Sequence, residues 1–334
     1  MISLETLKKD EQYSFLFTEF NNNPIQYLTL AGSISYGTNN ENSDIDIRGF
    51  FLESIEELLS LQTRREHYAE PITDTVLYSL QNFVTLLTSC NPNVIELLGV
   101  KEEHILYESL LAKSLRQNSS LFLSKKAYFT FVGYATAQLR RLQNALAHDT
   151  YDAEDKEKHI LKTIEYELQR SENDFKMLNK NHYYKLYIDK STDNIPEIFC
   201  DLKFNHISLR DLANRINQLH ATIRNFDKLN HRNRKKDDNH LNKHAMHLIR
   251  LLLTGIDILN NGIIRTYRPN DELKLLREIR AGLVPFNDVF SLANELESKI
   301  KVAYNQSLLP ENPNMNQINN WLISTYKTYL DFSL

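Results

Sequence analysis

Residues that break regular structure are scarce in this chain, whose 334 residues include only eight glycines and eight prolines. Cysteine is scarcer still. Cys90 and Cys200 lie far apart and lack the close spacing of a metal-binding pair. This argues against a disulfide scaffold and favours a reducing compartment, the cytoplasm. The shortage of glycine and proline favours long helices joined by few loops.

Long apolar runs and a strong net charge are also missing. The N-terminal residues lack a basic start followed by an apolar stretch, so we expect no signal peptide. The longest apolar region, residues 248–259, is interrupted by Arg250 and Asp257 and is too short to span a bilayer, so we expect no membrane partner. The net charge of −4 gives no global nucleic-acid signature, so any basic surface must be local.

The remaining sequence divides into a strand-like part and a helical part. Residues 25–30, 44–52 and 73–80 are rich in β-branched and aromatic residues or alternate polar with apolar ones, which predicts three strands. Beyond residue 80 the apolar positions recur with helical spacing, near residues 106–118, 124–148, 153–179, 208–229, 240–261, 270–281, 285–305 and 314–331. Residues 181–198 are expected to form an irregular connection and residues 230–239 a charged loop. The sequence therefore predicts a small α/β domain followed by a mostly helical domain.

The most informative stretch is residues 31–48, AGSISYGTNNENSDIDIR. Gly32 and Ser33 follow the first expected strand and predict a tight turn whose backbone N–H groups can approach a phosphate. Asp44 and Asp46 alternate with isoleucines, so in an extended strand the two carboxylates share one face, about 6–7 Å apart. Such a pair can hold divalent cations against a triphosphate, and a third carboxylate on a neighbouring strand would complete a two-metal site. Taken alone, the same pattern also fits a solvated turn.

The order of Gly32-Ser33, Tyr36-Gly37 and Asp44-x-Asp46 resembles the GS…DxD signature of polymerase-β-type nucleotidyltransferases. The chain is most similar to the predicted nucleotidyltransferases associated with RNA ligases, the RlaP family. Six segments along most of the chain carry this resemblance: GSISYGTNNENSDIDIRGFF, DTVLYSLQNFVTLL, NPNVIELL, FVGYATAQLRRL, KHAMHLIRLLLTGIDILNNG and LREIRAG.

The resemblance implies a polymerase-β-like α/β (α+β) catalytic domain with a mixed sheet, at residues 1–110. A helical domain at residues 111–334 would close the nucleotide cleft. It also implies two Mg²⁺ ions as cofactor, with Mn²⁺ as an alternative, and an NTP such as ATP, or a dNTP, as substrate. Gly32, Ser33 and nearby backbone amides would contact the phosphates.

Asp74 is the candidate for the third carboxylate, beside Asp44 and Asp46 as catalytic and metal-binding residues. It opens a β-rich run, and the resemblance places an acidic residue there. The alternative is an ordinary turn aspartate. Glu70 is the reserve candidate, whereas Glu53 and Glu66 occupy less suitable positions.

A basic helix is expected in the second domain. Lys243, His247 and Arg250 recur at i, i+4 and i+7, so they form one stripe that could bind the triphosphate. The same stripe could instead be a solvated polar face. Histidines 240, 244 and 247 do not predict zinc, because no fourth ligand has suitable spacing. Arg277 and Arg280 are further candidates.

Other readings remain open. Arg215 and His220 match a loose spacing found in helical ribonucleases, and the basic residues of 231–236 could contact a nucleic-acid backbone. The chain could instead be a nucleotide-binding scaffold without catalytic activity, in which the carboxylates have no role in a reaction. If the chain is a nucleotidyltransferase, a small molecule could be the acceptor.

The predicted function is Mg²⁺-dependent transfer of a nucleotidyl group to an acceptor hydroxyl, once or repeatedly. The acceptor would be a polynucleotide 3′ end or a protein. Tyr326 and Tyr329 are candidate protein acceptors, although helix packing is the favoured role for each of them. The base, the sugar, the acceptor and the oligomeric state stay open.

Overall fold

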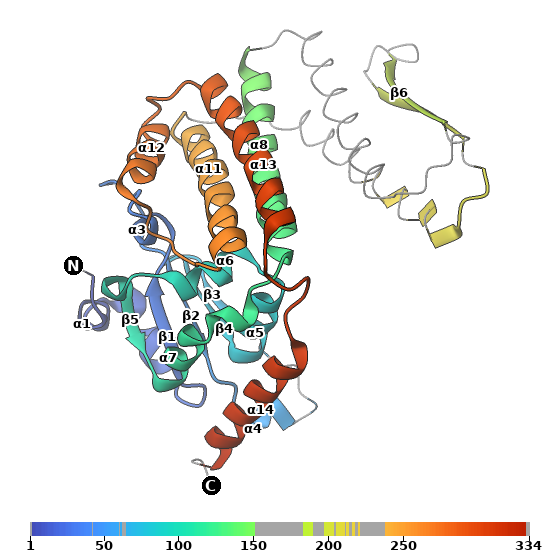
Figure 1. Cartoon of the computed structure of the whole chain (residues 1–334). Coiled ribbons are helices and arrows are strands. Elements are labelled where there is room, and N and C mark those ends of the chain that lie inside the picture. The colour runs from blue at the N-terminus through green and yellow to red at the C-terminus, as the bar shows by residue number, and fades with distance from the viewer. Residues whose placement is uncertain are drawn as a thin grey trace. The chain divides into compact units, whose positions relative to one another are not determined.

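A computed structural model describes residues 2–41, 43–59, 61, 65–150, 183–189, 197–203, 205–210, 212–213, 216–217, 220 and 238–331 (Figure 1). The chain divides into two compact units. The first combines Met1–Leu139 with Asp238–Leu334, and the second is Arg140–Asp237. The functional boundary near residue 110 stays a prediction. No helix in the described ranges is long and apolar enough to cross a membrane.

A five-stranded sheet forms one layer of the first unit. Its strands are β1 (Ile25–Leu30), β2 (Ile47–Phe51), β3 (His67–Glu70), β4 (Thr75–Ser79) and β5 (Ile105–Glu108). Their order across the sheet is β3-β4-β2-β1-β5. The β2 and β4 strands run parallel, whereas the other neighbouring pairs are antiparallel. The mixed sheet expected from the sequence is therefore confirmed.

Helices make up most of the rest of the first unit. The α-helices are α1 (Leu4–Lys8), α2 (Phe15–Thr18), α3 (Gly32–Tyr36), α4 (Ile55–Leu59), α5 (Leu80–Thr88), α6 (Pro92–Ile95), α7 (Leu110–Gln117), α11 (Asp238–Asn261), α12 (Asn270–Arg280), α13 (Phe286–Gln306) and α14 (Met315–Asp331). Short 3₁₀ helices are η1 (Glu11–Tyr13), η2 (Glu96–Gly99), η3 (Glu102–His104) and η4 (Ser119–Phe122). The predicted mostly helical C-terminal region is confirmed.

Helix α8 (Lys126–Thr150) begins in the first unit and continues into the second. The second unit also contains an antiparallel hairpin of β6 (Tyr183–Asp189) and β7 (Glu197–Lys203). This corrects the irregular connection expected at 181–198 for its described residues, because pairing of β6 with β7 supplies the hydrogen bonds of a strand. The expected helix at 153–179 lies outside the described residues.

Two further boundaries differ from the sequence-based prediction. The helix expected from residue 106 starts only at Leu110, because the preceding residues form β5 and pair with β1. The strand expected from residue 44 starts at Ile47. Both differences arise because strand pairing, rather than local pattern, decides where a strand begins.

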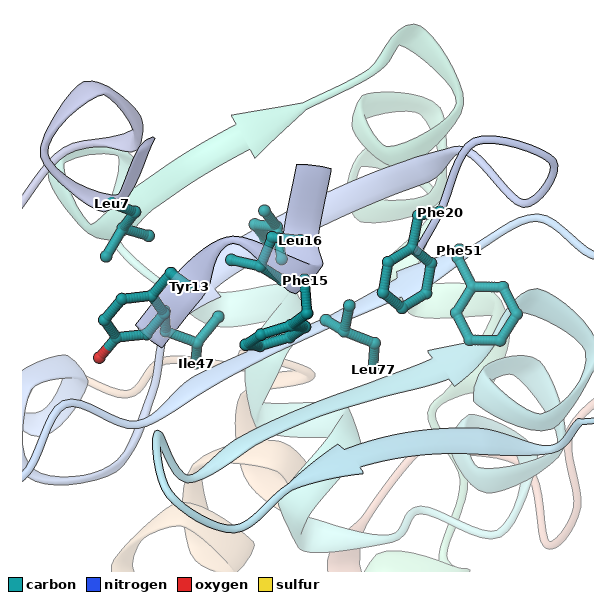
Figure 2. Packing of buried hydrophobic residues seen from close by; sticks show 9 residues of the cluster. Leu7, Tyr13, Phe15, Leu16, Phe20, Ile47, Phe51 and Leu77 are labelled. Carbon is teal, nitrogen blue, oxygen red and sulfur yellow. The ribbon is translucent and has the colours of Figure 1, made fainter. Parts of the chain in front are cut away.

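One face of the sheet is covered by the N-terminal segment, as Figure 2 shows. The buried cluster there consists of Leu7, Tyr13, Phe15, Leu16, Phe20, Leu28, Ile47, Phe51 and Leu77. Since side chains alternate along a strand, Ile47 and Leu77 send their neighbours Arg48 and Val76 to the opposite face. That second face carries Phe50, whose ring lies 4.8 Å from the ring of Phe83 on α5. The functional side chains discussed below lie on this second face.

Helix α11 packs against α12 and α13 (Figure 1). Its apolar side is buried in this layer, with Ala245, Leu248, Ile249 and Leu252 all fully buried. The polar residues between them lie on the side of α11 that borders a cavity, which is described in the next subsection. The helical spacing read from the sequence is thereby realised in the packing of this helix.

Candidate active site

A single cavity of about 620 Å³ in the first unit collects the side chains predicted from the sequence. It is lined by residues of the sheet, of α3, of η2 and of α11. The predicted residues that line it are Gly32, Ser33, Asp44, Asp46, Asp74, Lys243, His247 and Arg250. Residues more than 200 positions apart in the sequence therefore meet at one place.

Asp46 and Asp74 lie side by side because each immediately precedes a strand. In the parallel ladder Ile47 pairs with Thr75, and the Ile47 N–H donates to the Asp74 carbonyl at 3.3 Å. The Ala31 N–H donates to the Asp46 carbonyl at 2.8 Å, which extends the β1–β2 pairing by one residue. Parallel pairing of β2 with β4 thus brings the two carboxylates together at one edge of the sheet.

Asp44 is placed differently from the expectation. It precedes β2 in a segment without regular structure and its side chain is exposed, although it lines the same cavity. Over the part of the chain that the structure describes, no group of three histidine, cysteine, aspartate or glutamate side chains is arranged to hold a metal ion. Asp44 lacks the strand pairing that would fix it beside Asp46 and Asp74.

The two adjacent carboxylates perturb each other. Burial, the hydrogen bond with Asp74 and the negative charge of Asp74 together raise the pKa of Asp46 to about 7. The pKa of Asp74 is lowered, because it accepts the hydrogen bond from Asp46 and lies beside Arg48. Lys243 also favours the charged form of both groups. Near neutral pH Asp46 is therefore present in both protonated and ionised forms, and a nearby cation would favour the ionised form.

Arg48 is a cavity residue that the sequence analysis missed. Its Nη2 lies 2.8 Å from Asp74 Oδ1 and 3.8 Å from Asp46 Oδ1. Its Nη1 donates to the carbonyls of Ile47 and Asp74. The alternation Asp44-x-Asp46-x-Arg48 is the signal that could have identified it, since alternate residues of an extended segment share a face.

Gly32 differs from the predicted tight turn because it is the first residue of α3, with φ of +54°. A Cβ at this position would lie 1.6 Å from Asp46 Oδ2. Glycine is therefore required twice: for its backbone conformation, and for the space that the Asp46 carboxylate occupies. Ser33 follows within α3, and its carbonyl accepts from the Thr38 N–H at 2.9 Å.

Replacing Gly32 tests this close approach. We expect Gly32→Ala to lower nucleotidyl transfer about a hundredfold, because a displacement of about 1 Å at a reacting group has that effect. The positive φ should lower the free energy of unfolding by only about 1–2 kcal/mol. Steady-state rates and urea unfolding measure the two effects separately.

Gly262→Ala is the matched control. Gly262 also has a positive φ, +62°, but a Cβ there would meet nothing nearer than 3.9 Å. This variant should show the same loss of stability with normal transfer. Equal activity in the two variants would show that the position of the Asp46 carboxylate does not matter.

On α11, Lys243 and His247 border the cavity as predicted. Lys243 is exposed and acts electrostatically on both Asp46 and Asp74. The pKa of His247 is lowered well below its usual value by burial and by the nearby charges of Arg250 and Lys243. His247 is therefore a neutral hydrogen-bonding group beside the charged Lys243.

Arg250 makes contacts that the sequence did not suggest. Its Nη1 lies 2.8 Å from Glu96 Oε1, and its guanidinium stacks 3.7 Å from the centre of the Tyr36 ring. The Tyr36 hydroxyl also donates to Glu96. The Arg250 and Glu96 side chains are only 7% and 3% exposed. Although Arg250 borders the cavity, its charge is balanced inside the protein, and it ties α11 to α3 and η2.

Several lesser candidates are also placed. His240 and Arg280 line the cavity, whereas Arg277 Nε donates to the Gly37 carbonyl at 2.7 Å. Glu70, the reserve third ligand, accepts from the Ile72 N–H and does not line the cavity. The remaining candidates, Arg215 and the loop at 230–237, lie outside the described residues.

Tyr326 lies away from this cavity. Its hydroxyl donates to Glu53 at 2.6 Å, and Glu53 also accepts from the Gln81 N–H. Glu53 follows the end of β2 opposite to the end where Asp46 lies. In this arrangement Tyr326 anchors α14 to the sheet and does not reach the carboxylates.

Comparison with known proteins adds one finding. The model of a protein family described as RlaP, RNA repair pathway DNA polymerase beta family, matches residues 2–169. No curated protein and no solved structure gave a match. The matched residues include β1, α3, β2 and β4, with the Asp46 and Asp74 carboxylates between them. Family match, mixed sheet and paired carboxylates agree, and the chain belongs to the RNA repair pathway DNA polymerase beta family, a family of nucleotidyltransferases.

Proposed function

We propose that this protein transfers a nucleotidyl group from an NTP or dNTP to an acceptor hydroxyl, with Mg²⁺ as cofactor. The observation that carries the proposal is the meeting of Asp46 and Asp74 with Lys243 and His247 around one cavity. Carboxylates suit a metal ion, and an ammonium and an imidazole suit phosphate oxygens. A triphosphate with its metal needs both kinds of group at once.

The residues present fit a magnesium ion that arrives with the nucleotide. Proteins commonly hold Mg²⁺ through one or two carboxylates, and substrate phosphates complete the coordination. Asp46 and Asp74 would provide the two carboxylates, and the exposed Asp44 would join them in the nucleotide complex. When bound, the ion would offset negative charge on the phosphates and lower the pKa of the acceptor hydroxyl.

The protein's own groups have separate parts in the reaction. The acceptor oxygen forms a bond to the α-phosphorus, the bond from that phosphorus to the β-phosphate oxygen breaks, and pyrophosphate leaves. Asp46 or Asp74 would take the hydroxyl proton, whose release the bound ion would favour by lowering the pKa of the hydroxyl. Lys243, His247 and Ser33 would hold the phosphates, with Arg250 keeping α11 in place.

The acceptor that we propose is the 3′ hydroxyl of a polynucleotide or a hydroxyl of a protein. The family's description as part of an RNA repair pathway supports the polynucleotide. A phosphate backbone would bring its own charges to the basic side of the cavity. Transfer to a polynucleotide should therefore weaken steeply with salt, because phosphate contacts release counterions.

Labelled nucleotides test this function directly. The full chain would be incubated with each α-³²P-labelled NTP and dNTP, Mg²⁺, and either an RNA oligonucleotide or no added acceptor. We expect label in the RNA, sensitive to nuclease, or label on the polypeptide that survives denaturation. Nucleotide binding without transfer to either acceptor, or to a panel of small-molecule alcohols, would instead indicate a silent scaffold. Transfer only to a small molecule would refute the polymeric acceptor.

A further inference from the structure

Arg48 occupies the position where a cation would neutralise the two carboxylates. It comes from β2, two residues after Asp46, and its side chain points to the same cavity. The Nη2 atom is 2.8 Å from one Asp74 oxygen, a short charge-assisted bond, and 3.8 Å from Asp46. Before any ligand binds, the guanidinium therefore supplies much of the positive charge that this pair needs.

The rest of the guanidinium is held by the backbone. Nη1 donates to the carbonyls of Ile47 and Asp74, at the point where β2 and β4 pair. These bonds do not involve a carboxylate, so they persist when the Asp74 side chain changes partner. Only the Nη2 end has to find a new acceptor. The Arg48 side chain is 21% exposed, and this end faces the cavity.

A free divalent cation would have to compete with Arg48 for Asp74 and be repelled by its charge. A nucleotide-bound cation meets a different situation, because the triphosphate offers anionic oxygens that can accept from Nη2. Arg48 would then exchange one anionic partner for another, so its charge would not be left uncompensated. The arrangement favours binding of metal and nucleotide together over binding of metal alone.

On the basis of the function proposed above, we propose that Arg48 keeps the Asp46–Asp74 pair closed to free divalent cations and transfers its hydrogen bond to the triphosphate when the nucleotide delivers the metal. Arg48 is thus a gatekeeper for the metal and a ligand of the substrate. The plain alternative is that Arg48 only fastens β2 to β4.

Mn²⁺ binding to the full chain distinguishes these roles without any measurement of turnover. The free Mn²⁺ signal in electron paramagnetic resonance would be titrated with and without α,β-methylene-ATP, and the Mn²⁺ that the analogue binds without protein would be subtracted. For the wild type, we expect the analogue to tighten Mn²⁺ binding. Arg48→Met should tighten nucleotide-free Mn²⁺ binding about tenfold, the scale of one charge-assisted hydrogen bond, and should reduce the benefit of the analogue. Arg48→Lys keeps the positive charge but loses the planar guanidinium with its two Nη donors. It should therefore tighten nucleotide-free Mn²⁺ binding by less than Arg48→Met does.

Lys274→Met is the charge-matched control. Lys274 is 76% exposed and lies outside the cavity, so its removal changes the net charge equally and should leave Mn²⁺ binding unchanged. Unaltered or weaker nucleotide-free Mn²⁺ binding in folded Arg48→Met would overturn the gatekeeper role while leaving the proposed function in place. If Arg48→Met does not fold, the absence of tightening in Arg48→Lys overturns it equally. A wild type that binds no Mn²⁺ even with the analogue would refute both proposals.

Discussion

Asp46→Asn should lower the rate of nucleotidyl transfer by a factor of about 10³ or more while the protein stays folded. Asp46 lies against Gly32, shares a proton with Asp74 and borders the proposed triphosphate site. Loss of its negative charge removes a metal ligand and the proposed base together, and each contributes several kcal/mol to transition-state stabilisation. Initial rates with labelled nucleotide, together with circular dichroism, measure the effect.

Two comparisons sharpen this prediction. Asp74→Asn should be nearly as damaging, because Asp74 is the paired carboxylate, and Asp44→Ala should also abolish transfer if Asp44 joins the metal when nucleotide binds. Asp288→Asn removes an exposed carboxylate from the first turn of α13 that does not line the cavity, and it should leave transfer unchanged. An Asp46→Asn protein that is folded and keeps more than about a tenth of the wild-type rate would show that the metal assignment is wrong.

The second large effect is on stability rather than on substrate binding. Arg250→Met should lower the free energy of unfolding by about 3–5 kcal/mol, because it leaves the buried Glu96 carboxylate without its cation. Glu96→Gln should lower the free energy of unfolding by the same amount, because it leaves the buried Arg250 guanidinium without its carboxylate partner. Urea unfolding followed by circular dichroism measures both.

The double variant Arg250→Met/Glu96→Gln should recover much of this stability, because neither buried charge remains. An exposed ion pair provides the control: Glu295 and Lys299 are 2.6 Å apart on α13, and each is 58% exposed. Glu295→Gln should change the free energy of unfolding by less than about 1 kcal/mol. If Arg250→Met instead unfolds like the wild type but binds nucleotide less tightly, Arg250 contacts the triphosphate, as the helical stripe first suggested.

The hydrogen-bonding network around Arg250 shows what a helical pattern leaves undetermined. The sequence placed Lys243, His247 and Arg250 on one side of α11, and the structure keeps them on one cavity wall. Helical periodicity cannot specify what lies opposite each residue. Arg250 meets Glu96, 154 residues away in the sequence, whereas Lys243 meets solvent. The same stripe therefore contains a buried structural cation, a neutral imidazole and an exposed ammonium.

The sequence by itself determined the broad strand–helix division, the glycine that opens α3 and which carboxylates are candidates for the site, because these follow from local alternation and from residue chemistry. It also indicated that Asp74 lies at the start of a strand-like segment. It did not specify that β4 pairs in parallel with β2 and so sets Asp74 beside Asp46. The sequence also did not place Arg48 between Asp46 and Asp74. The pairing of β2 with β4 and the position of Arg48 both depend on strand register.

Only the tertiary structure decided the electrostatics of the cavity. The raised pKa of Asp46, the lowered pKa of His247 and the pairing of Arg250 with Glu96 all come from burial and from groups distant in sequence. Charge interactions fall off over a few ångströms and strengthen when water is excluded. A local pattern can therefore name the charged residues of this protein, but the contacts of α11 with α3 and η2 determine which of its charges are paired inside the protein.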